Sequence, residues 1–332
     1  MQLPSSPASR LRLLTVVAGL ALFAAACGEN DGATVRNLTE TESGDSGSAS
    51  GSGSGSASGS GSASASGTGS GSGSASAPAD VGTATTVGDG GYEYASNVDA
   101  HRLVVADLCD IGDLLDGGDF DAVETIYRDG VHSVNDDGTV RSIGGFAASG
   151  DRSHGLDDFS GTSTPLDEFV TAALDGTGVF EGESDAVRAQ GVEKGMRNQV
   201  MIAWVVHELN AALVKAEAGD FDVATGAVHN WDEGWAFYHG AEPSCAPYAT
   251  ANSRAGNFGT VADDGETALA NEAILAAMIE GRDALLAEDA DGAAVAADEV
   301  IRNVVITYSQ AAVRYASLIE DDLAEGDDAA AR

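Results

Sequence analysis

The residues best suited to chemistry in this 332-residue chain are carboxylates, imidazoles and a phenol on the apolar faces of expected helices. Asp232 and His239 fall at the edge of the apolar stripe of a helix expected around 222–239, while His229 and Glu233 stack one turn apart on a neighbouring face. A buried carboxylate is costly unless it is paired or bound to metal, so such groups could converge on a hard cation such as ferric iron. Further candidates lie on the apolar faces of other helices: Glu208, His101 and Tyr308.

Each candidate also has an ordinary structural interpretation. Tyr308 can be interpreted as a core ring whose hydroxyl donates to a carbonyl, and His101 as a core histidine with a hydrogen-bond partner. Asp232 fits a cap or a pair with an arginine such as Arg314, and the pair of His229 and Glu233 fits an exposed helix surface. The metal-site hypothesis therefore depends on these side chains meeting in one interior pocket.

Catalytic motifs are incomplete in this sequence. His207 and Glu208 begin the HExxH pattern of zinc proteases, but Ala211 stands where the second histidine is required. There is no Glu-x-x-His pair of the kind found in ferritin-like di-iron bundles, and no nucleophile has an evident base. The sequence favours a binding protein over an enzyme.

The charge of the chain is strongly acidic. It has 53 acidic and 16 basic residues, which give a formal net charge of −37. Nucleic acid is a poor partner, because few cations are present to neutralise phosphates. The acidity fits a solvated coat suited to high salt, simple solubility, or attraction of cations toward the surface.

The amino end has the form of a secretory signal. Arg10 and Arg12 precede a short apolar run, and Cys27 follows three alanines. The run is short for a membrane span of roughly 20 residues. Residues 1–27 are therefore expected to be a signal with a lipobox-like site, with Cys27 as the lipidated amino terminus. This predicts an extracytoplasmic protein anchored to the membrane by lipid, and plain cleavage near Ala26 is the alternative.

Residues 28–90 are expected to be a linker. From about 43 to 79 the chain is almost wholly Ser, Gly and Ala, which cannot bury apolar surface and should stay disordered. A coil of about 35 such residues reaches roughly 30–35 Å, enough to hold a domain clear of a lipid surface.

The remaining cysteines suggest one disulfide. If Cys27 carries lipid, Cys109 and Cys245 are left as a pair in an oxidising compartment. Their bridge would close a long loop, and two thiols alone cannot form a zinc cluster.

Apolar residues recur at helical spacing through most of residues 91–332. Helices are expected at about 97–116, from 120 to before Gly130, at 167–174, 184–217, 222–239, 265–287 and 293–322, with no clear period over 131–165. The repeated sequence Gly-Asp-Phe-Asp, at 118–121 and 219–222, predicts a glycine stop and an aspartate cap each time. The expected fold class is all-α, a bundle of about six or seven helices joined by short turns and preceded by a disordered tether.

Several stretches of the sequence resemble one known family. Residues 230–238, NWDEGWAFY, are similar to the signature of the low-iron-inducible periplasmic proteins, also called Fe-assimilating proteins. Agreeing segments occur in the same order: IYRDG at 126–130, SIGGFA at 142–147, KG at 194–195 before a helix that ends in HEL at 207–209, RAGNFGT at 254–260, and SQAAVRYA at 309–316.

The resemblance covers roughly 91–322 and implies an extracytoplasmic iron-binding protein that helps a cell to acquire iron. It makes Asp232 and Glu233 the positions most plausibly functional, and it suggests iron-uptake machinery as a partner. A synergistic anion such as carbonate would be held by Arg314 or a helix amino terminus. This chain differs from the algal members in having few cysteines and an expected lipid anchor.

Two other functions fit the sequence. One is a helical lipoprotein that acts as an interaction scaffold without metal. The other is an imelysin-like iron-regulated lipoprotein, whose GxHxxE pattern is only approximated by Gly226, His229 and Asp232.

Overall fold

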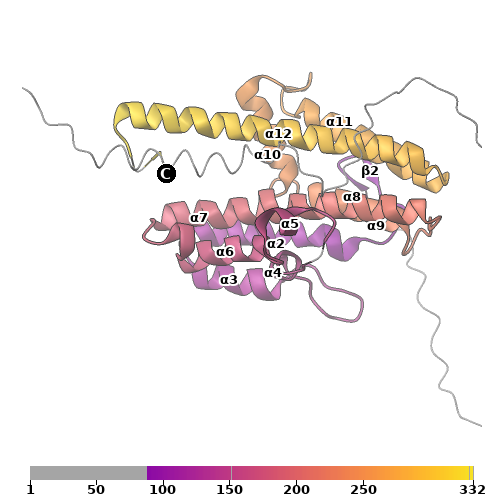
Figure 1. Cartoon of the computed structure of the whole chain (residues 1–332), viewed down its shortest axis with the longest axis horizontal. Coiled ribbons are helices and arrows are strands. Elements are labelled where there is room, and N and C mark those ends of the chain that lie inside the picture. Colours follow the sequence, from indigo (N-terminus) through magenta and orange to yellow (C-terminus); the bar gives the residue numbers. More distant parts are fainter. Residues whose placement is uncertain (1–87, 151, 329, 332) are drawn as a thin grey trace, which may run out of the picture. The chain divides into compact units, whose positions relative to one another are not determined.

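The computed structural model describes residues 88–150, 152–328 and 330–331, and within them the chain is mostly helical (Figure 1). The regular β-structure of this part is one hairpin of two short antiparallel strands, β1 (Gly88–Asp89) and β2 (Tyr92–Glu93). The expected all-α class is confirmed. The expected signal segment, lipidation at Cys27 and the linker up to residue 87 lie outside the described residues.

The first layer contains α2 (Asp99–Asp116) and α3 (Phe120–Asp129), which pack together. Asp119 caps α3 as expected, since its side chain accepts a hydrogen bond from the Ala122 N–H. The region without a clear period differs from the expectation, because it contains the short helices α4 (Ile143–Ala147) and α5 (Leu156–Ser160). It leads into α6 (Pro165–Asp175), which starts with the proline that can occupy a first helical turn.

The middle layer comes from the long helical segment expected at 184–217. It consists of α7 (Asp185–Lys194), a π-helical stretch at Gly195–Val200, and α8 (Met201–Glu217), preceded by a 3-10 turn at Gly178–Phe180. The next helix, α9, spans Ala227–Tyr238 and begins later than the expected residue 222.

The second expected aspartate cap, Asp220 before α9, is wrong. The Asp222 side chain accepts hydrogen bonds from the N–H groups of Ala224 and Thr225, and Gly226 is the residue that precedes α9. A turn built around Asp222 therefore delays the helix by several residues.

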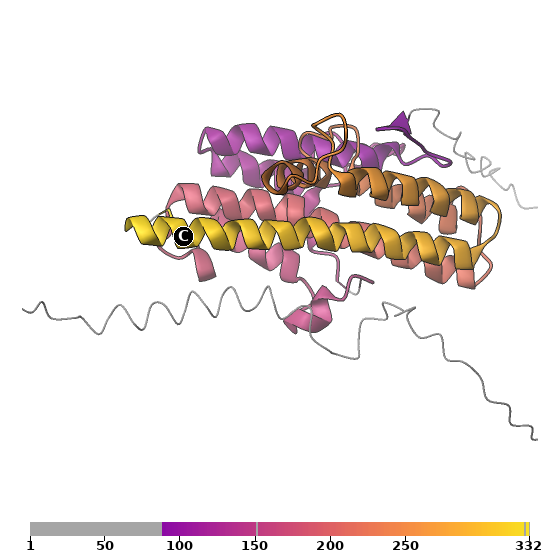
Figure 2. The same ribbon diagram turned by 90° about the horizontal axis from the view of Figure 1, so that it is seen from above.

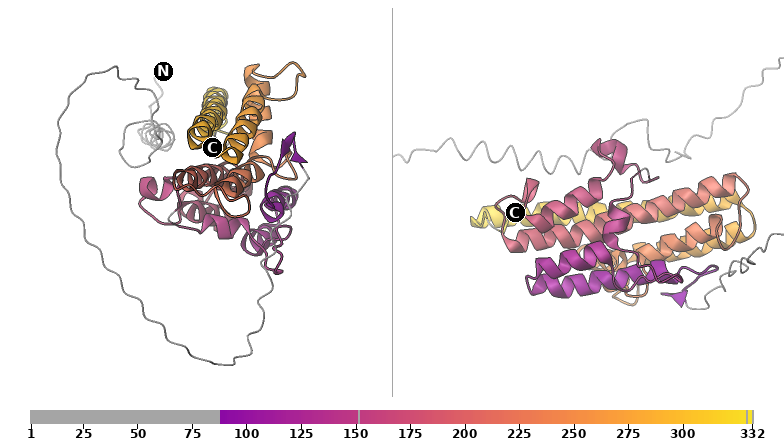
Figure 3. Two further views of the ribbon diagram at one scale, coloured as in Figure 1. Left: turned by 90° about the vertical axis from the view of Figure 1, so that its right-hand side faces the viewer. Right: turned by 90° about the horizontal axis from the view of Figure 1, so that it is seen from below.

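The third layer contains α11 (Leu269–Leu286) and α12 (Ala290–Glu325), which run side by side along the bundle (Figure 2). Both expected helices are present with slightly shifted ends. A helix not anticipated from the sequence, α10 (Pro247–Phe258), packs against them. The views in Figure 3 show α12 on the opposite side of the middle layer from α2 and α3.

Helix α9 lies at the centre of this arrangement, because it contacts α2, α8 and α11. Every residue from Trp231 to Tyr238 is buried. The Trp231 indole donates to the Met278 carbonyl of α11, and the Trp235 indole donates to the Asp89 carbonyl of the hairpin. Burying whole aromatic rings while satisfying their N–H groups fixes α9 firmly between its neighbours.

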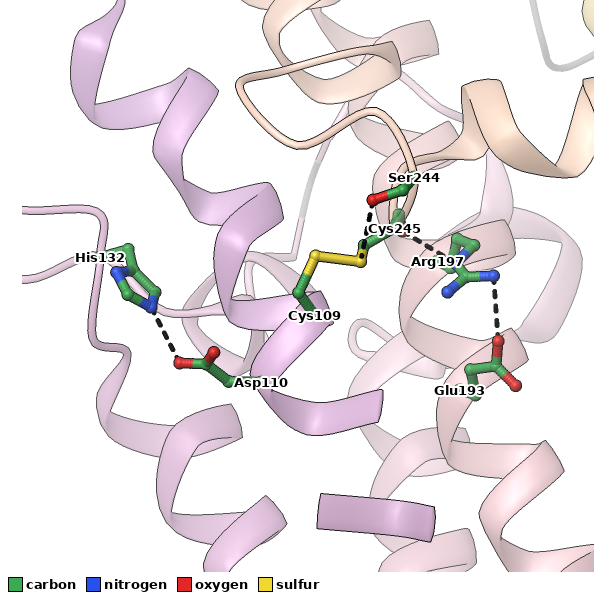
Figure 4. The surroundings of a disulfide bond; sticks show 7 residues. All are labelled: Cys109, Asp110, His132, Glu193, Arg197, Ser244 and Cys245. Atoms are coloured by element: carbon green, nitrogen blue, oxygen red, sulfur yellow. Dashed lines mark hydrogen bonds and ion pairs between the residues drawn. A yellow bond between two sulfur atoms is a disulfide. The ribbon is translucent and has the colours of Figure 1, made fainter. Parts of the chain in front are cut away.

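The expected disulfide is present between Cys109 of α2 and Cys245, at a sequence separation of 136 (Figure 4). The Cys245 carbonyl also accepts a hydrogen bond from Arg197 in the π-helical stretch, and Arg197 pairs with Glu193. The bridge thus links the first layer to the segment that follows α9.

Candidate metal centre

Two buried carboxylates, one buried imidazole and one half-buried imidazole from α2, α8 and α9 meet in one polar cluster. One carboxylate oxygen of Glu233, Oε1, lies 3.0 Å from His101 Nδ1 and 3.1 Å from His229 Nε2. The Asn230 amide donates to Glu208 Oε2 at 2.5 Å and to Glu233 Oε2 at 3.2 Å. We call these five residues the Glu233 cluster.

The cluster carboxylates are shielded from water, Glu208 being 3% exposed and Glu233 7%. Burial and the adjacent Glu233 charge raise the pKa of Glu208 to about 9. Burial opposes ionisation of Glu233 as well, but hydrogen bonding to His229 and the adjacent imidazoles outweigh it and lower its pKa to about 2. At neutral pH the two carboxyl groups therefore hold one proton between them, because burial and their mutual repulsion disfavour two adjacent charges.

His101 is held as a neutral imidazole. Burial lowers its pKa to about 4, against the opposing effect of the Glu233 carboxylate and with a smaller contribution from the positive charge of Arg141. A neutral ring nitrogen is the form that binds metal ions.

Three buried aromatic rings pack together beside the His101 imidazole of the cluster. Phe146 of α4 packs edge-on against Trp204 and Phe237, with ring centroids 4.7 and 5.0 Å apart, and the His101 ring lies 5.6 Å from Phe237. The Trp204 indole donates to the Phe146 carbonyl. The SIGGFA segment at 142–147 thus contributes a ring that helps to keep the cluster dry.

Asp232, the neighbour of Glu233 in the chain, points to the other side of α9. Its Oδ2 accepts hydrogen bonds from the Ala95 N–H, the Ser96 N–H and the Ser96 hydroxyl, and its Oδ1 accepts from the Tyr92 hydroxyl at 2.6 Å. Burial raises its pKa, although these hydrogen bonds oppose the shift. Asp232 is therefore outside the cluster and fixes the segment after the hairpin to α9.

His239 and Tyr308 also lie apart from the Glu233 cluster. The His239 ring stacks on Trp235 and its Nδ1 contacts the Gly240 carbonyl at 2.9 Å, so the ring serves the packing at the end of α9. The Tyr308 hydroxyl donates to Asn198 of the π-helical stretch at 3.2 Å. The structure thus brings together His101, Glu208, His229 and Glu233 and leaves the other three predicted ligands elsewhere.

One atom of the cluster lacks a hydrogen-bond partner. Asn230 Oδ1 is a buried oxygen with no hydrogen-bonded neighbour, although both bonds of its amide nitrogen are made. Among the described residues, no group of three or more His, Cys, Asp or Glu side chains is arranged to hold a metal ion. The chemical fit is nevertheless good, because two imidazoles, two carboxyl groups and a vacant amide oxygen are donors that suit iron.

Comparison with known proteins places these features in a family. Residues 68–324 match the family described as "Low iron-inducible periplasmic protein". The chain belongs to this family. The matched range of the low iron-inducible periplasmic proteins includes the whole Glu233 cluster, and the family description indicates a periplasmic location. No curated protein and no solved structure matches the chain.

Sequence reasoning missed Asn230 and Ser96 as members of the site. Asn230 lies in the NWDEGWAFY segment, and its spacing of three residues from Glu233 places both on one helix face. Ser96 bonds both Asp232 and His229 Nδ1, so it connects the buried aspartate to the cluster. No sequence pattern signals Ser96, because it lies in an irregular segment between β2 and α2.

Proposed function

We propose that this protein binds iron outside the cytoplasm and assists its acquisition, with the Glu233 cluster as the iron site. The observation that carries the proposal is the meeting of two imidazoles and two carboxyl groups around Glu233 and Asn230, whose side-chain oxygen is buried without a hydrogen-bond partner. His101, Glu208, His229, Asn230 and Glu233 would hold the ion. The protein acts as a binder rather than an enzyme and passes its cargo to uptake machinery.

The protonation states of the cluster support cation binding. A neutral His101 is available without proton loss, while the two carboxyl groups hold between them one proton that a cation can displace. A cation then compensates two buried carboxylates that would otherwise repel each other. Ferric iron is the cargo expected from the sequence, with an anion such as carbonate as an additional ligand, and the mixed donor set accommodates ferrous iron as well.

The test is an iron titration of the purified protein and two matched variants. Fe³⁺ is supplied from nitrilotriacetate, and Fe²⁺ is supplied under anaerobic conditions. Wild type and Glu280→Gln, whose change lies on the exposed surface of α11, should bind one iron per chain. Glu233→Gln should weaken binding by about 100-fold, since even supporting residues of metal sites contribute about 10–100-fold.

Two results would refute the proposed site. One is equal binding by wild type and Glu233→Gln, when circular dichroism shows both to be folded. The other is that wild type takes up no more iron than a generic acidic protein, which would favour a scaffold without metal.

We further propose that the protein is anchored by lipid at Cys27. The small residues before this cysteine support lipidation. Among the described residues no helix is both long and apolar enough to cross a bilayer. In a bacterial host grown with labelled palmitate, the full chain should carry label and sediment with membranes, whereas Cys27→Ser should lose both. Unlabelled full chain would exclude the anchor.

A further inference from the structure

A pocket of about 180 Å³ lies over the two imidazoles of the Glu233 cluster. One side is the first turn of α2, from Val98 to His101, and another is the loop that carries Val134, Asn135 and Asp136. His229 and Arg141 complete the lining.

The pocket gives access to the interior of the cluster. His101 and His229 line it and also contact Glu233 Oε1, so Glu233 lies directly behind these two rings. Glu208 and Glu233 are themselves buried. A ligand in the pocket therefore meets the imidazoles first and the carboxylates next.

The size and polarity of the pocket favour a small hydrated species. A water molecule takes about 30 Å³ of liquid, so the pocket holds an ion with several waters. Pockets for drug-sized molecules are about 300–1,000 Å³ and mostly apolar. This pocket is smaller, and Asn97, Asp99, Asn135 and Asp136 give it a largely polar lining.

Arg141 places a fixed positive charge in this pocket. Its guanidinium hydrogen-bonds Asn135, and its backbone N–H donates to the Ser133 carbonyl at 2.8 Å. The start of the same loop is anchored where the N–H groups of Val131 and His132 donate to the buried Asp107 carboxylate. The loop thus holds Arg141 in place, where it repels an entering cation that Asp99 and Asp136 attract.

We propose that this pocket is the entrance to the Glu233 cluster, that it admits a hydrated metal ion rather than a metal enclosed by a large chelator, and that Arg141 limits the rate of entry. The inference rests on the proposed iron site and adds the form of the cargo and its route.

The experiment measures the rate of iron binding by tryptophan fluorescence, since Trp204 packs on rings that contact His101. Anaerobic Fe²⁺ serves as the hydrated ion, and ferric iron in a hexadentate hydroxamate serves as the enclosed one. Arg141→Gln should bind Fe²⁺ about tenfold faster than wild type, an effect within the range for charges that line a binding cleft. The matched control, Arg302→Gln, removes a charge from the exposed surface of α12 and should leave the rate unchanged.

A second variant tests the route by obstruction. Val134 is 50% exposed at the pocket, so Val134→Trp should fill the entrance without disturbing the core. Its rate of iron binding should fall below that of the wild type, while the final stoichiometry stays at one iron per chain. The inference would be overturned, and the iron site would stand, if Arg141→Gln and Val134→Trp both bound iron at the wild-type rate. It would also be overturned if the protein took up iron from the ferric hydroxamate as fast as it takes up hydrated Fe²⁺. Failure of wild type to bind iron would overturn both proposals.

Discussion

Asp232 and Glu233 show how two adjacent carboxylates on one helix can serve different purposes. A step of about 100° along α9 turns Glu233 toward His101 and Asp232 toward the segment after the hairpin. Asp232 also bonds the Ser96 hydroxyl, which contacts His229. Asp232 therefore supports the orientation of one cluster imidazole without entering the cluster.

This difference predicts a separation of stability from binding. In Asp232→Asn one acceptor oxygen is replaced by an NH₂ group that faces existing donors, so the free energy of unfolding should fall by about 1–3 kcal/mol. Folded molecules should still take up one iron each. Urea unfolding and iron titration of the same sample measure the two effects, with Glu233→Gln as the opposite case. Loss of iron from a fully folded Asp232→Asn would instead show that binding depends on Asp232, either as a ligand or through the Ser96 contact to His229.

Of the four predicted ligands that lie in the cluster, His101 and Glu208 could be predicted because polar residues aligned with apolar stripes are residues that the fold must bury. His229 and Glu233 lie on a neighbouring face of α9, and the packing of α9 against α2 and α8 brings them to the other two. The same criterion could not exclude Asp232, His239 and Tyr308, which are also wholly or partly buried. Their partners come from distant or irregular parts of the chain. Helical periodicity cannot show that Tyr92 and Ser96 are the hydrogen-bond partners of Asp232, or that Asn198 is the partner of Tyr308.

At the scale of helices, the contact between α9 and α11 depends on a glycine. A Cβ atom at Gly281 would overlap the Trp231 ring. Trp231 is fully buried and its indole donates to the Met278 carbonyl, so the ring cannot move away freely. The absence of a side chain at position 281 lets α11 approach the helix that carries Glu233.

Gly281→Ala should therefore destabilise the protein although alanine is the better helix former. Overpacking costs about 1–3 kcal/mol, which exceeds the gain in helix propensity. Gly112→Ala in α2 is the matched control: a Cβ there meets no atom within 4 Å, so this change should stabilise by about 0.5–1 kcal/mol. Chemical denaturation measures both. A Gly281→Ala protein as stable as the control would mean that the helices separate at little cost.

The long amphipathic helices were predictable because each repeats its apolar spacing over several turns. Helix α10 was not, since its buried residues are mostly small and its sequence is rich in polar residues. The π-helical stretch before α8 has no periodic signature either. Its Arg197 and Asn198 bond Cys245, Thr250 and Tyr308, which are contacts set by tertiary packing.

For the whole molecule, the disulfide is the covalent link between distant segments. With a sequence separation of 136 between the cysteines, the chain-entropy estimate of the stabilisation by the disulfide is about 3–5 kcal/mol. The double variant Cys109→Ser/Cys245→Ser should lose about that free energy of unfolding. Reducing the wild-type protein should lower its melting temperature and leave the double variant unaffected. Equal sensitivity of both proteins to the reductant would assign the effect to something other than this bridge.

The acidic surface sets the response of the whole molecule to salt. A formal charge of −37 makes the compact state repel itself more strongly than the expanded chain does. Raising the salt from 0.1 to 1 M shortens the screening length from about 10 Å to about 3 Å, so NaCl should raise the melting temperature. Most of the rise should occur below about 0.3 M, where screening changes fastest and the effect of salt on apolar burial is still small.

A comparison with sucrose separates charge screening from the effect of salt on apolar burial, because sucrose favours burial without screening charge. If NaCl acts through screening, a low concentration should stabilise the protein more than an equal concentration of sucrose. A melting temperature that is insensitive to low salt would mean that the carboxylates are too well separated to repel one another. Cation attraction or solubility would then explain the acidic coat better than adaptation to salt.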